Sequence, residues 1–311
     1  MMYTASIYQE AMQHNRTIHT ITSLEPDFPP LLQEIPSCPK NIFYLGTLTN
    51  QRCIAIVGTR KASAQGCQTA YAFAQTCVQQ GWCVVSGLAL GIDAAAHQGA
   101  LDAGGCTWAV IAGGVDRIYP QQHEQLATNI IESGGCILSE YAPQTPTYPN
   151  QFIARNRIIS GLARAIVIIE APRASGALTT ARFAGEQGRD IFVVPGPISS
   201  ENFIGSHALI RDGARLVTSM NDVWYDMGES PTETPSPPTN TSTEIDTCQQ
   251  RIMEILRREK GASVDKLIAM TTLKTQDVQA ALSALIIKGM VVQEGITFKI
   301  TVPSRTPRHH T

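Results

Sequence analysis

The sequence predicts an α/β protein with a Rossmann-like, doubly wound and largely parallel sheet, followed by a small C-terminal winged-helix domain. Short runs rich in β-branched residues recur along the first two thirds of the chain, and they are continuously apolar, as is typical of strands buried on both faces. Helical patterns separate several of these runs, and each pattern ends at a glycine, the usual C-terminal stop of a helix. Alternation of strands and helices over about 170 residues indicates a parallel sheet. The expected strands lie at 53–58, 83–87, 108–114, 135–140, 165–170, 190–196 and 214–219, and the expected helices at 68–80, 122–133 and 178–187.

The remaining segments suggest how the chain divides into domains. The stretch EPDFPPLLQEIPSCP near the N-terminus is proline-rich and has little regular pattern, and ESPTETPSPPTNTST has the Pro/Ser/Thr composition of a flexible linker. Three helical patterns and two short β runs around Gly295 follow the linker, which is the order of a winged helix. We expect an extended arm at 1–45, the sheet domain at 46–227, the linker at 228–243, the winged helix at 244–302 and a disordered tail at 303–311.

Composition restricts the class of protein. The 311 residues carry a net charge of −2, so any nucleic-acid site must be local. No apolar run has the roughly 18 residues of a membrane helix, and the N-terminus lacks a signal-peptide pattern, so we expect a cytoplasmic protein without membrane contact. The eight cysteines form no CxxC pair and are expected to be buried, reduced thiols.

Ligands of an open parallel sheet bind beyond the carboxyl ends of its strands. Small residues there let a ligand approach the backbone, and the amides at a helix N-terminus favour an anion. Two loops, 86–97 and 173–184, place glycine and serine ahead of a helix, although glycine and serine are also common helix caps. Neither loop is a GxGxxG or Walker A motif, which argues against NAD or FAD, and we expect no cofactor. The candidate residues are Gly58, Thr59, Arg60, Lys61, Ser86, Gly87, Ser175, Gly176 and Thr179.

The cations of the sheet domain are almost all arginines. Residues 46–227 contain eleven Arg and one Lys against thirteen acidic residues. Because the planar guanidinium can grip a phosphate with two bonds or stack on a base, this bias suggests recognition. Arg60 directly follows a strand, and Phe152 offers a stacking platform three residues before Arg155. Arg155 and Arg157 flank Asn156 on a helix and must point in different directions, so one can face the site while the other pairs with an acid.

No catalytic set can be assigned from spacing, and we expect a binding protein rather than an enzyme. Asp93 and His97 are four residues apart on one helix and could share a metal or a proton, but a third ligand is not evident. A hydrogen bond within the helix is the simpler interpretation. Glu140 and Glu170 end strands and could act as bases, while His123 and His207 are candidate polar caps. We expect no metal site.

Six motifs follow one another in the sheet domain: IAIVGTRKASAQG, VVSGLALGIDAAAHQGAL, AVIAGGVDRIYPQQHEQL, ILSEYAP, FIARNRIISGLARAIVIIEAPRASGALTTARFAGEQGRDIFVVPG and GSHALIRDGARLV. Together they resemble the motifs of the DprA/Smf family of bacterial DNA-processing proteins, and the resemblance covers about residues 40–220 and the winged helix. It implies an extended Rossmann fold that binds single-stranded DNA, protects incoming strands in natural transformation and helps load the RecA recombinase. It also implies a homodimer without known enzymatic activity. The positions matching the family's DNA pocket are Gly58, Thr59, Arg60, Phe152, Arg155, Asn156 and Arg157, with the Ser175–Thr179 loop.

The sequence departs from the family in three places. Gln121 follows Tyr119-Pro120, and Asn150 precedes the Phe152 motif, where family members often carry lysine; lost cations should lower affinity and flatten its salt dependence. The roughly 45 residues before the expected sheet are too few for the family's helical N-terminal domain plus its connecting arm, so we expect that domain to be missing or reduced. The expected recognition helix of the winged-helix domain, 275–289, has Lys288 as its only basic residue. This favours a contact with protein, or a weak contact with DNA, over the reading of bases.

Two other functions remain open at this point. The first is a phosphoribohydrolase of the LOG type, but that class requires a PGGxGTxxE stretch, and the nearest segment, PGPISSENFIGSH, lacks its core. The second is a ligand-sensing winged-helix regulator, which would bind duplex DNA in a sequence-dependent way. Arg164 lies at the start of a strand, opposite the expected ligand, and we interpret it as a structural or surface charge.

Overall fold

The computed structural model describes residues 17–229 and, in the C-terminal part, residues 247–300 apart from 260, 272, 274, 288, 289, 295 and 296. The chain forms two compact units, Met1–Thr234 and Pro235–Thr311. Most of the expected linker and the whole expected tail at 303–311 lie outside the described residues. Gly228 and Glu229 were assigned to the linker, but Glu229 forms ion pairs with Arg52 and Arg164 in the first unit. The described part of the sheet domain therefore runs to residue 229, and Arg164 is a surface ion-pair partner.

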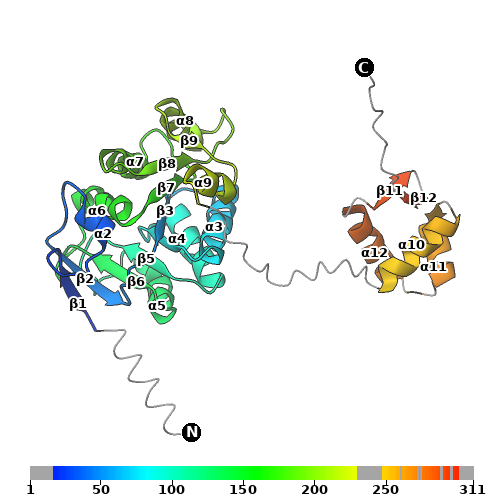
Figure 1. The fold of residues 1–311 in the computed structure, drawn as a ribbon, viewed down its shortest axis with the longest axis horizontal. Coiled ribbons are helices and arrows are strands. Elements are labelled where there is room, and N and C mark those ends of the chain that lie inside the picture. Colours follow the sequence, from blue (N-terminus) through cyan, green and yellow to red (C-terminus); the bar gives the residue numbers. More distant parts are fainter. Residues whose placement is uncertain are drawn as a thin grey trace, which may run out of the picture. The chain divides into compact units, whose positions relative to one another are not determined.

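The first unit contains a nine-stranded sheet in the order β1-β2-β6-β5-β4-β3-β7-β8-β9 (Figure 1). Seven strands, from β3 to β9, pair in parallel, and each overlaps a run that the sequence predicts, although β5 begins one residue earlier than expected. The strand order changes direction between β3 and β7, and ligands of open α/β sheets bind at such a switch point. The parallel strands are β3 (Cys53–Val57), β4 (Cys83–Ser86), β5 (Thr107–Val110), β6 (Cys136–Ser139), β7 (Ala165–Ile168), β8 (Asp190–Val193) and β9 (Arg215–Leu216).

The segment expected to be an extended arm contains regular structure instead. Strand β1 (His19–Thr22) pairs antiparallel with β2 (Asn41–Gly46), and the short helix α2 (Pro30–Gln33) lies between them. Strand β2 pairs antiparallel with β6, with Phe43 opposite Ser139. The expectation was wrong because these short strands owe their order to pairing with distant residues rather than to local pattern. The sheet domain therefore begins near residue 19.

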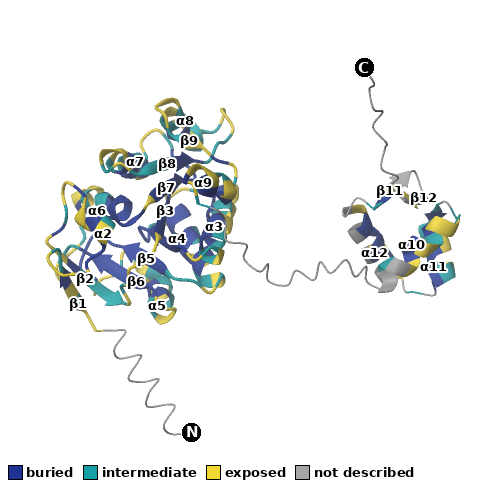
Figure 2. Ribbon diagram, in the orientation of Figure 1, coloured by how far each residue is buried: buried dark blue, intermediate teal, exposed yellow. Residues whose placement is uncertain are grey.

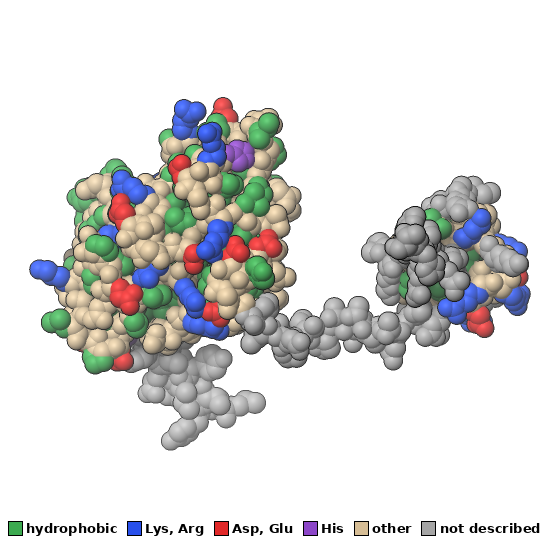
Figure 3. All heavy atoms as spheres, turned by 45° about the horizontal axis from the view of Figure 1, so that its top comes forward, with side chains coloured by type: hydrophobic (Ala, Val, Ile, Leu, Met, Phe, Trp, Pro, Cys, Tyr) green, Lys and Arg blue, Asp and Glu red, His purple; other side chains and the backbone are tan. Residues whose placement is uncertain are grey.

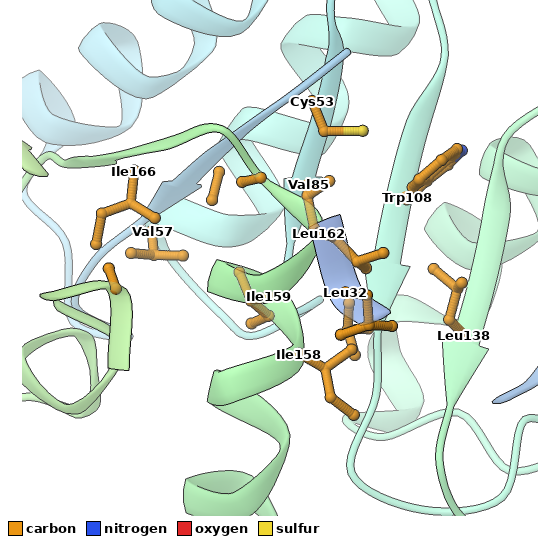
Figure 4. Packing of buried hydrophobic residues seen from close by; sticks show 14 of the residues in the cluster. Leu32, Cys53, Val57, Val85, Trp108, Leu138, Ile158, Ile159, Leu162 and Ile166 are labelled. Carbon is orange, nitrogen blue, oxygen red and sulfur yellow. The ribbon is translucent and has the colours of Figure 1, made fainter. Parts of the chain in front are cut away.

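Helices cover both faces of the sheet, which explains the continuously apolar strands. In β3, Cys53, Ala55 and Val57 belong to one core cluster, while Ile54 and Ile56 belong to another. Helices α2, α6 and α7 supply the first cluster, as Figure 4 shows for Leu32 and Ile158 beside sheet residues such as Val85. Strands β3 to β7 are fully buried (Figure 2). The helices are α3 (Ala64–Gln79), α4 (Ile92–Asp102), α5 (Glu124–Glu132), α6 (Pro149–Leu162), α7 (Gly176–Glu186), α8 (Ile204–Arg211) and α9 (Met220–Asp226), with 3₁₀ turns Gln121–His123 and Glu201–Phe203.

The second unit is a winged helix, as predicted. Three helices pack around a core that includes Ile252, Leu267 and Leu285. A small antiparallel sheet in the order β10-β12-β11 forms the wing, and its first strand was not foreseen. Within the described parts of both units, no helix is long and apolar enough to cross a bilayer. The elements are α10 (Thr247–Glu259), β10 (Ala262–Ser263), α11 (Val264–Thr271), α12 (Thr275–Ile287), β11 (Val291–Glu294) and β12 (Thr297–Ile300).

Candidate nucleic-acid interface

A pocket of about 550 Å³ lies at the carboxyl ends of β3 and β7, the switch point of the sheet. Three segments that are distant in the sequence form most of its wall: the loop after β3, the first half of α6 and the start of α7. The sequence-predicted residues that the structure brings together here are Gly58, Thr59, Arg60, Phe152, Arg155, Asn156, Ser175 and Gly176. Ala89, Asp93, Tyr119 and Thr180 line the same pocket and were not assigned to the site from the sequence. Tyr119 lies in the motif AVIAGGVDRIYPQQHEQL, so the sequence contained a reason to include it among the candidate residues.

Arg60 is the exposed cation of this pocket. Its guanidinium lies 4.8 Å from the centre of the Phe152 ring, within the range of a cation–π contact. The Tyr119 ring lies 5.7 Å from the Phe152 ring at a tilt of 58°, and Tyr119 is 54% exposed. Arg60 takes part in no ion pair with any residue that the structure describes. A phosphate-gripping arginine beside accessible aromatic faces is the combination that single-stranded nucleic acids need.

Arg155 reaches the pocket from α6 but is only 3% exposed. Its Nη1 donates to the carbonyl oxygen of Val110 at 2.6 Å, and its Nε has no hydrogen-bond partner among the described residues. Burial lowers the pKa of Arg155 to about 10, although the nearby Asp93 carboxylate raises it. Burial raises the pKa of Asp93, and the Arg155 charge and the amides of Ala89 and Gly87 oppose that shift. Arg155 therefore supports the pocket from its buried side, which is called the pocket floor below, and the Asp93 carboxylate offsets part of the positive charge of Arg155.

Ser86 and Gly87 were predicted to contact the ligand, but neither lines the pocket. Ser86 is fully buried and donates to the carbonyl oxygen of Ile56 at 2.7 Å. A Cβ atom added to Gly87 would lie 1.9 Å from Arg155 Nη1 and 2.7 Å from Asp93 Oδ2. A glycine is therefore needed at position 87 because the Arg155 side chain passes over it, and not because a ligand approaches it.

Arg157 is the arginine of the pair that binds an acid. Its two terminal nitrogens donate to both carboxylate oxygens of Glu140, at 2.7 and 2.6 Å, and its Nε donates to the carbonyl oxygen of Ser37 at 3.0 Å. The hydrogen bond with Glu140 raises the pKa of Arg157. Arg157 lies outside the pocket, so the structure does not bring it together with Arg60 and Phe152, because α6 points the two arginines in different directions.

The N-terminus of α7 closes one side of the pocket. Ser175 Oγ caps the helix by accepting from the Ala177 amide at 3.2 Å, and Asn156 Nδ2 donates to the Gly176 carbonyl at 3.2 Å. No heavy atom within 4 Å would meet a side chain on Gly176, so the first turn is open, and its amides favour an anion. Thr180, rather than the predicted Thr179, lines the pocket, and the exposed Lys61 lies outside it.

The acidic and histidine side chains considered for catalysis have other partners. Glu170 is fully buried and accepts from Ser63 and Asn202, which fixes the start of α3. The expected hydrogen bond between Asp93 and His97 is absent: Asp93 accepts from the Gly87 amide, and His97 Nδ1 lies 2.7 Å from Thr107 Oγ1.

The other two histidines contact carbonyl oxygens. Nδ1 of His123 lies 2.8 Å from the carbonyl oxygen of Leu88, and Nε2 of His207 lies 3.1 Å from the carbonyl oxygen of Gly196. The described ranges contain no group of three or more His, Cys, Asp or Glu arranged to hold a metal ion.

Charged side chains of both signs alternate over the face of the molecule in Figure 3. On that face, the described side chains of the first unit form no broad basic surface. A doubly wound sheet with such a pocket at its switch point, followed by a winged helix, defines a class of Rossmann-like proteins suited to nucleic acid.

Comparison with known proteins identifies the family. The family model for DNA recombination-mediator protein A matches residues 19–228, and the model for the DprA winged helix domain matches residues 231–295. The chain belongs to the DprA/Smf family of DNA recombination mediators. Protein Smf of Synechocystis is 36% identical over 88% of this chain and 78% of its own length. The matched segments span 55% to 78% of the curated relatives' lengths.

Two solved structures share this fold. The X-ray structure of DprA from Streptococcus pneumoniae superposes with a TM-score of 0.64 at 39% identity, covering 69% of this chain and 76% of that one. DprA from Helicobacter pylori superposes with a TM-score of 0.60 at 25% identity, covering 69% of this chain and 97% of that one. The Helicobacter structure is described for its single-stranded DNA binding mode.

Proposed function

We propose that this protein binds single-stranded DNA in the pocket at the sheet's switch point and acts as a binding protein rather than an enzyme. The observation that carries the proposal is the exposed Arg60 guanidinium over the Phe152 ring, beside Tyr119 and the open first turn of α7. Membership of a DNA recombination-mediator family and the single-stranded DNA described for the Helicobacter relative support it.

The pocket favours single strands over duplex for a physical reason. Aromatic rings can stack only on bases that are free of the helical stack, and phosphates of a flexible strand can follow a curved surface. Arg60 and the α7 amides offer two positive positions at the pocket, and Asp93 offsets part of the charge of Arg155. We therefore expect binding that is insensitive to sequence and has a shallow salt dependence, because few phosphates are neutralised.

Within this proposal, the protein is a cytoplasmic homodimer that protects incoming DNA and helps load the RecA recombinase in natural transformation and recombination. These finer roles rest on the family resemblance. Sedimentation of the purified chain tests the dimer, and RecA filament formation on strands coated by a single-strand-binding protein tests the loading. A chain that sediments as a monomer and does not accelerate filament formation would limit the proposal to DNA binding.

Arg60→Ala tests the site directly. We expect it to weaken binding of a short labelled single strand by about 1–3 kcal/mol, the range for a lost charge-assisted contact, in fluorescence anisotropy with unlabelled duplex as competitor. The matched control is Arg182→Ala on α7, because Arg182 is also exposed and also lies over a phenylalanine ring, Phe183, but outside the pocket. Equal affinities of wild type and Arg60→Ala, or equal competition by duplex, would refute the proposal.

A further inference from the structure

Three cysteines form a row across neighbouring strands at the amino ends of the sheet, opposite the DNA pocket. Cys53 on β3 is the direct register partner of Cys83 on β4. Cys106 directly precedes β5, and its carbonyl oxygen accepts from the Val84 amide next to Cys83. All three side chains belong to the same face of the sheet as Trp108, which Figure 4 shows together with Cys53. Neighbouring strands thus hold these thiols side by side.

The sulfur atoms of Cys83 and Cys106 are 3.6 Å apart. Adjacent strands lie about 4.8 Å apart, which falls within the Cα separation that a disulfide tolerates. Forming a bond of about 2.05 Å requires the sulfurs to approach by roughly 1.5 Å, a movement that rotation about two side-chain torsions can supply. The spacing of neighbouring strands therefore allows a disulfide between these two positions.

The two thiols differ in access and acidity. Cys83 is 1% exposed, whereas Cys106 is partly exposed. The hydrogen bond from Cys83 lowers the pKa of the Cys106 thiol, burial opposes this shift, and the nearby Trp108 indole lowers the pKa further. Burial raises the pKa of the Cys83 thiol well above its usual range. Because the thiolate is the nucleophile, Cys106 is the thiol that reacts with an external oxidant and Cys83 the one that then reacts with it.

We propose that Cys106 and Cys83 are a reversible oxidation site that forms a disulfide when the protein meets a peroxide. The Cys106 thiolate attacks one peroxide oxygen, so that a sulfur–oxygen bond forms and the oxygen–oxygen bond breaks with loss of hydroxide. The Cys83 thiol then attacks the sulfenic sulfur, the sulfur–sulfur bond forms, and the departing hydroxide leaves as water with the Cys83 proton. The thiols lose two electrons, the peroxide gains them, and a dithiol reductant reverses the change.

Peptide mapping of the full-length, pre-reduced protein after treatment with hydrogen peroxide tests the disulfide. Trypsin and Asp-N together release segment 62–92, which contains Cys67, Cys77 and Cys83, and segment 102–115, whose single cysteine is Cys106. We expect these segments to be linked without reductant and separate with dithiothreitol. The Cys83→Ala variant should lose the link and the Cys77→Ala variant keep it. Fragmentation of the linked wild-type peptides locates the bonded sulfur even if Cys83→Ala fails to fold.

Trapping of the sulfenic acid with dimedone tests the order of the steps. Cys38 and Cys67 are the matched controls, because both are partly exposed and burial raises their thiol pKa. We expect Cys106 to be labelled faster than either, because its lowered thiol pKa gives a larger thiolate fraction, and its sulfenic acid to persist longer in Cys83→Ala, where the second thiol is missing. Absence of the 62–92 to 102–115 link, or equal labelling of Cys38, Cys67 and Cys106, would overturn the proposal.

Discussion

Replacement of Gly87 by alanine tests whether the pocket floor depends on the buried Arg155. The new methyl group would lie 1.9 Å from Arg155 Nη1, so the guanidinium must move by about 1.5 Å to reach van der Waals distance. Arg155 is enclosed, and its movement would break the 2.6 Å hydrogen bond to Val110 and weaken its attraction to Asp93. A lost hydrogen bond from a charged group costs about 1.5–3 kcal/mol, and overpacking costs about 1–3 kcal/mol. Together these costs predict that Gly87→Ala lowers the free energy of unfolding by about 2.5–6 kcal/mol.

Urea unfolding followed by tryptophan fluorescence measures this effect in the full-length chain. The three tryptophans are Trp82, Trp108 and Trp224, and all lie in the first unit, so the signal reports that unit alone. Gly176→Ala is the matched control, because its methyl group would meet no heavy atom within 4 Å. If Gly87→Ala unfolds at the same urea concentration as Gly176→Ala and wild type, the assignment of Gly87 to the passage of Arg155 is incorrect.

Two further predictions concern residues outside direct ligand contact. Arg157→Ala should lower the free energy of unfolding by about 1–3 kcal/mol, because it breaks the partly buried ion pair with Glu140. The affinity for single-stranded DNA should stay at the wild-type level. A loss of this affinity without a loss of stability would show that Arg157 belongs to the DNA site. Burial lowers the pKa of His97 from 6.5 to about 3, so the unfolded chain binds more protons between these values, and the stability that neutral His97 contributes is lost as pH falls below about 6.5. His97→Gln should therefore reduce the pH slope of the unfolding free energy between these values by up to about 1.4 kcal/mol per pH unit; an unchanged slope would show that His97 is not the titrating group.

The parallel sheet was predictable because its strands are buried on both faces. In β3, five successive residues are buried and alternate between two core clusters. Such a strand appears in the sequence as a short, continuously apolar run, which a strand buried on both faces explains better than any other element does. Strands β1 and β2 show a weaker apolar pattern in the sequence, since β1 has one buried residue among four and depends on pairing with β2. Their order comes from contacts between distant segments, which residue patterns do not contain.

The sequence by itself determined the fold class, the winged helix and the edge of the sheet that carries the pocket, because helix and strand periodicity and small residues at strand ends are local properties. It also placed Arg60 and Phe152 at that edge. Only the tertiary structure decided which arginine of the Arg155-Asn156-Arg157 segment faces the pocket. Asp93 and the Val110 carbonyl lie on one side of α6, and Glu140 lies where Arg157 reaches it. Those partners come from other strands and loops, so the choice depends on how α6 is rotated against the sheet.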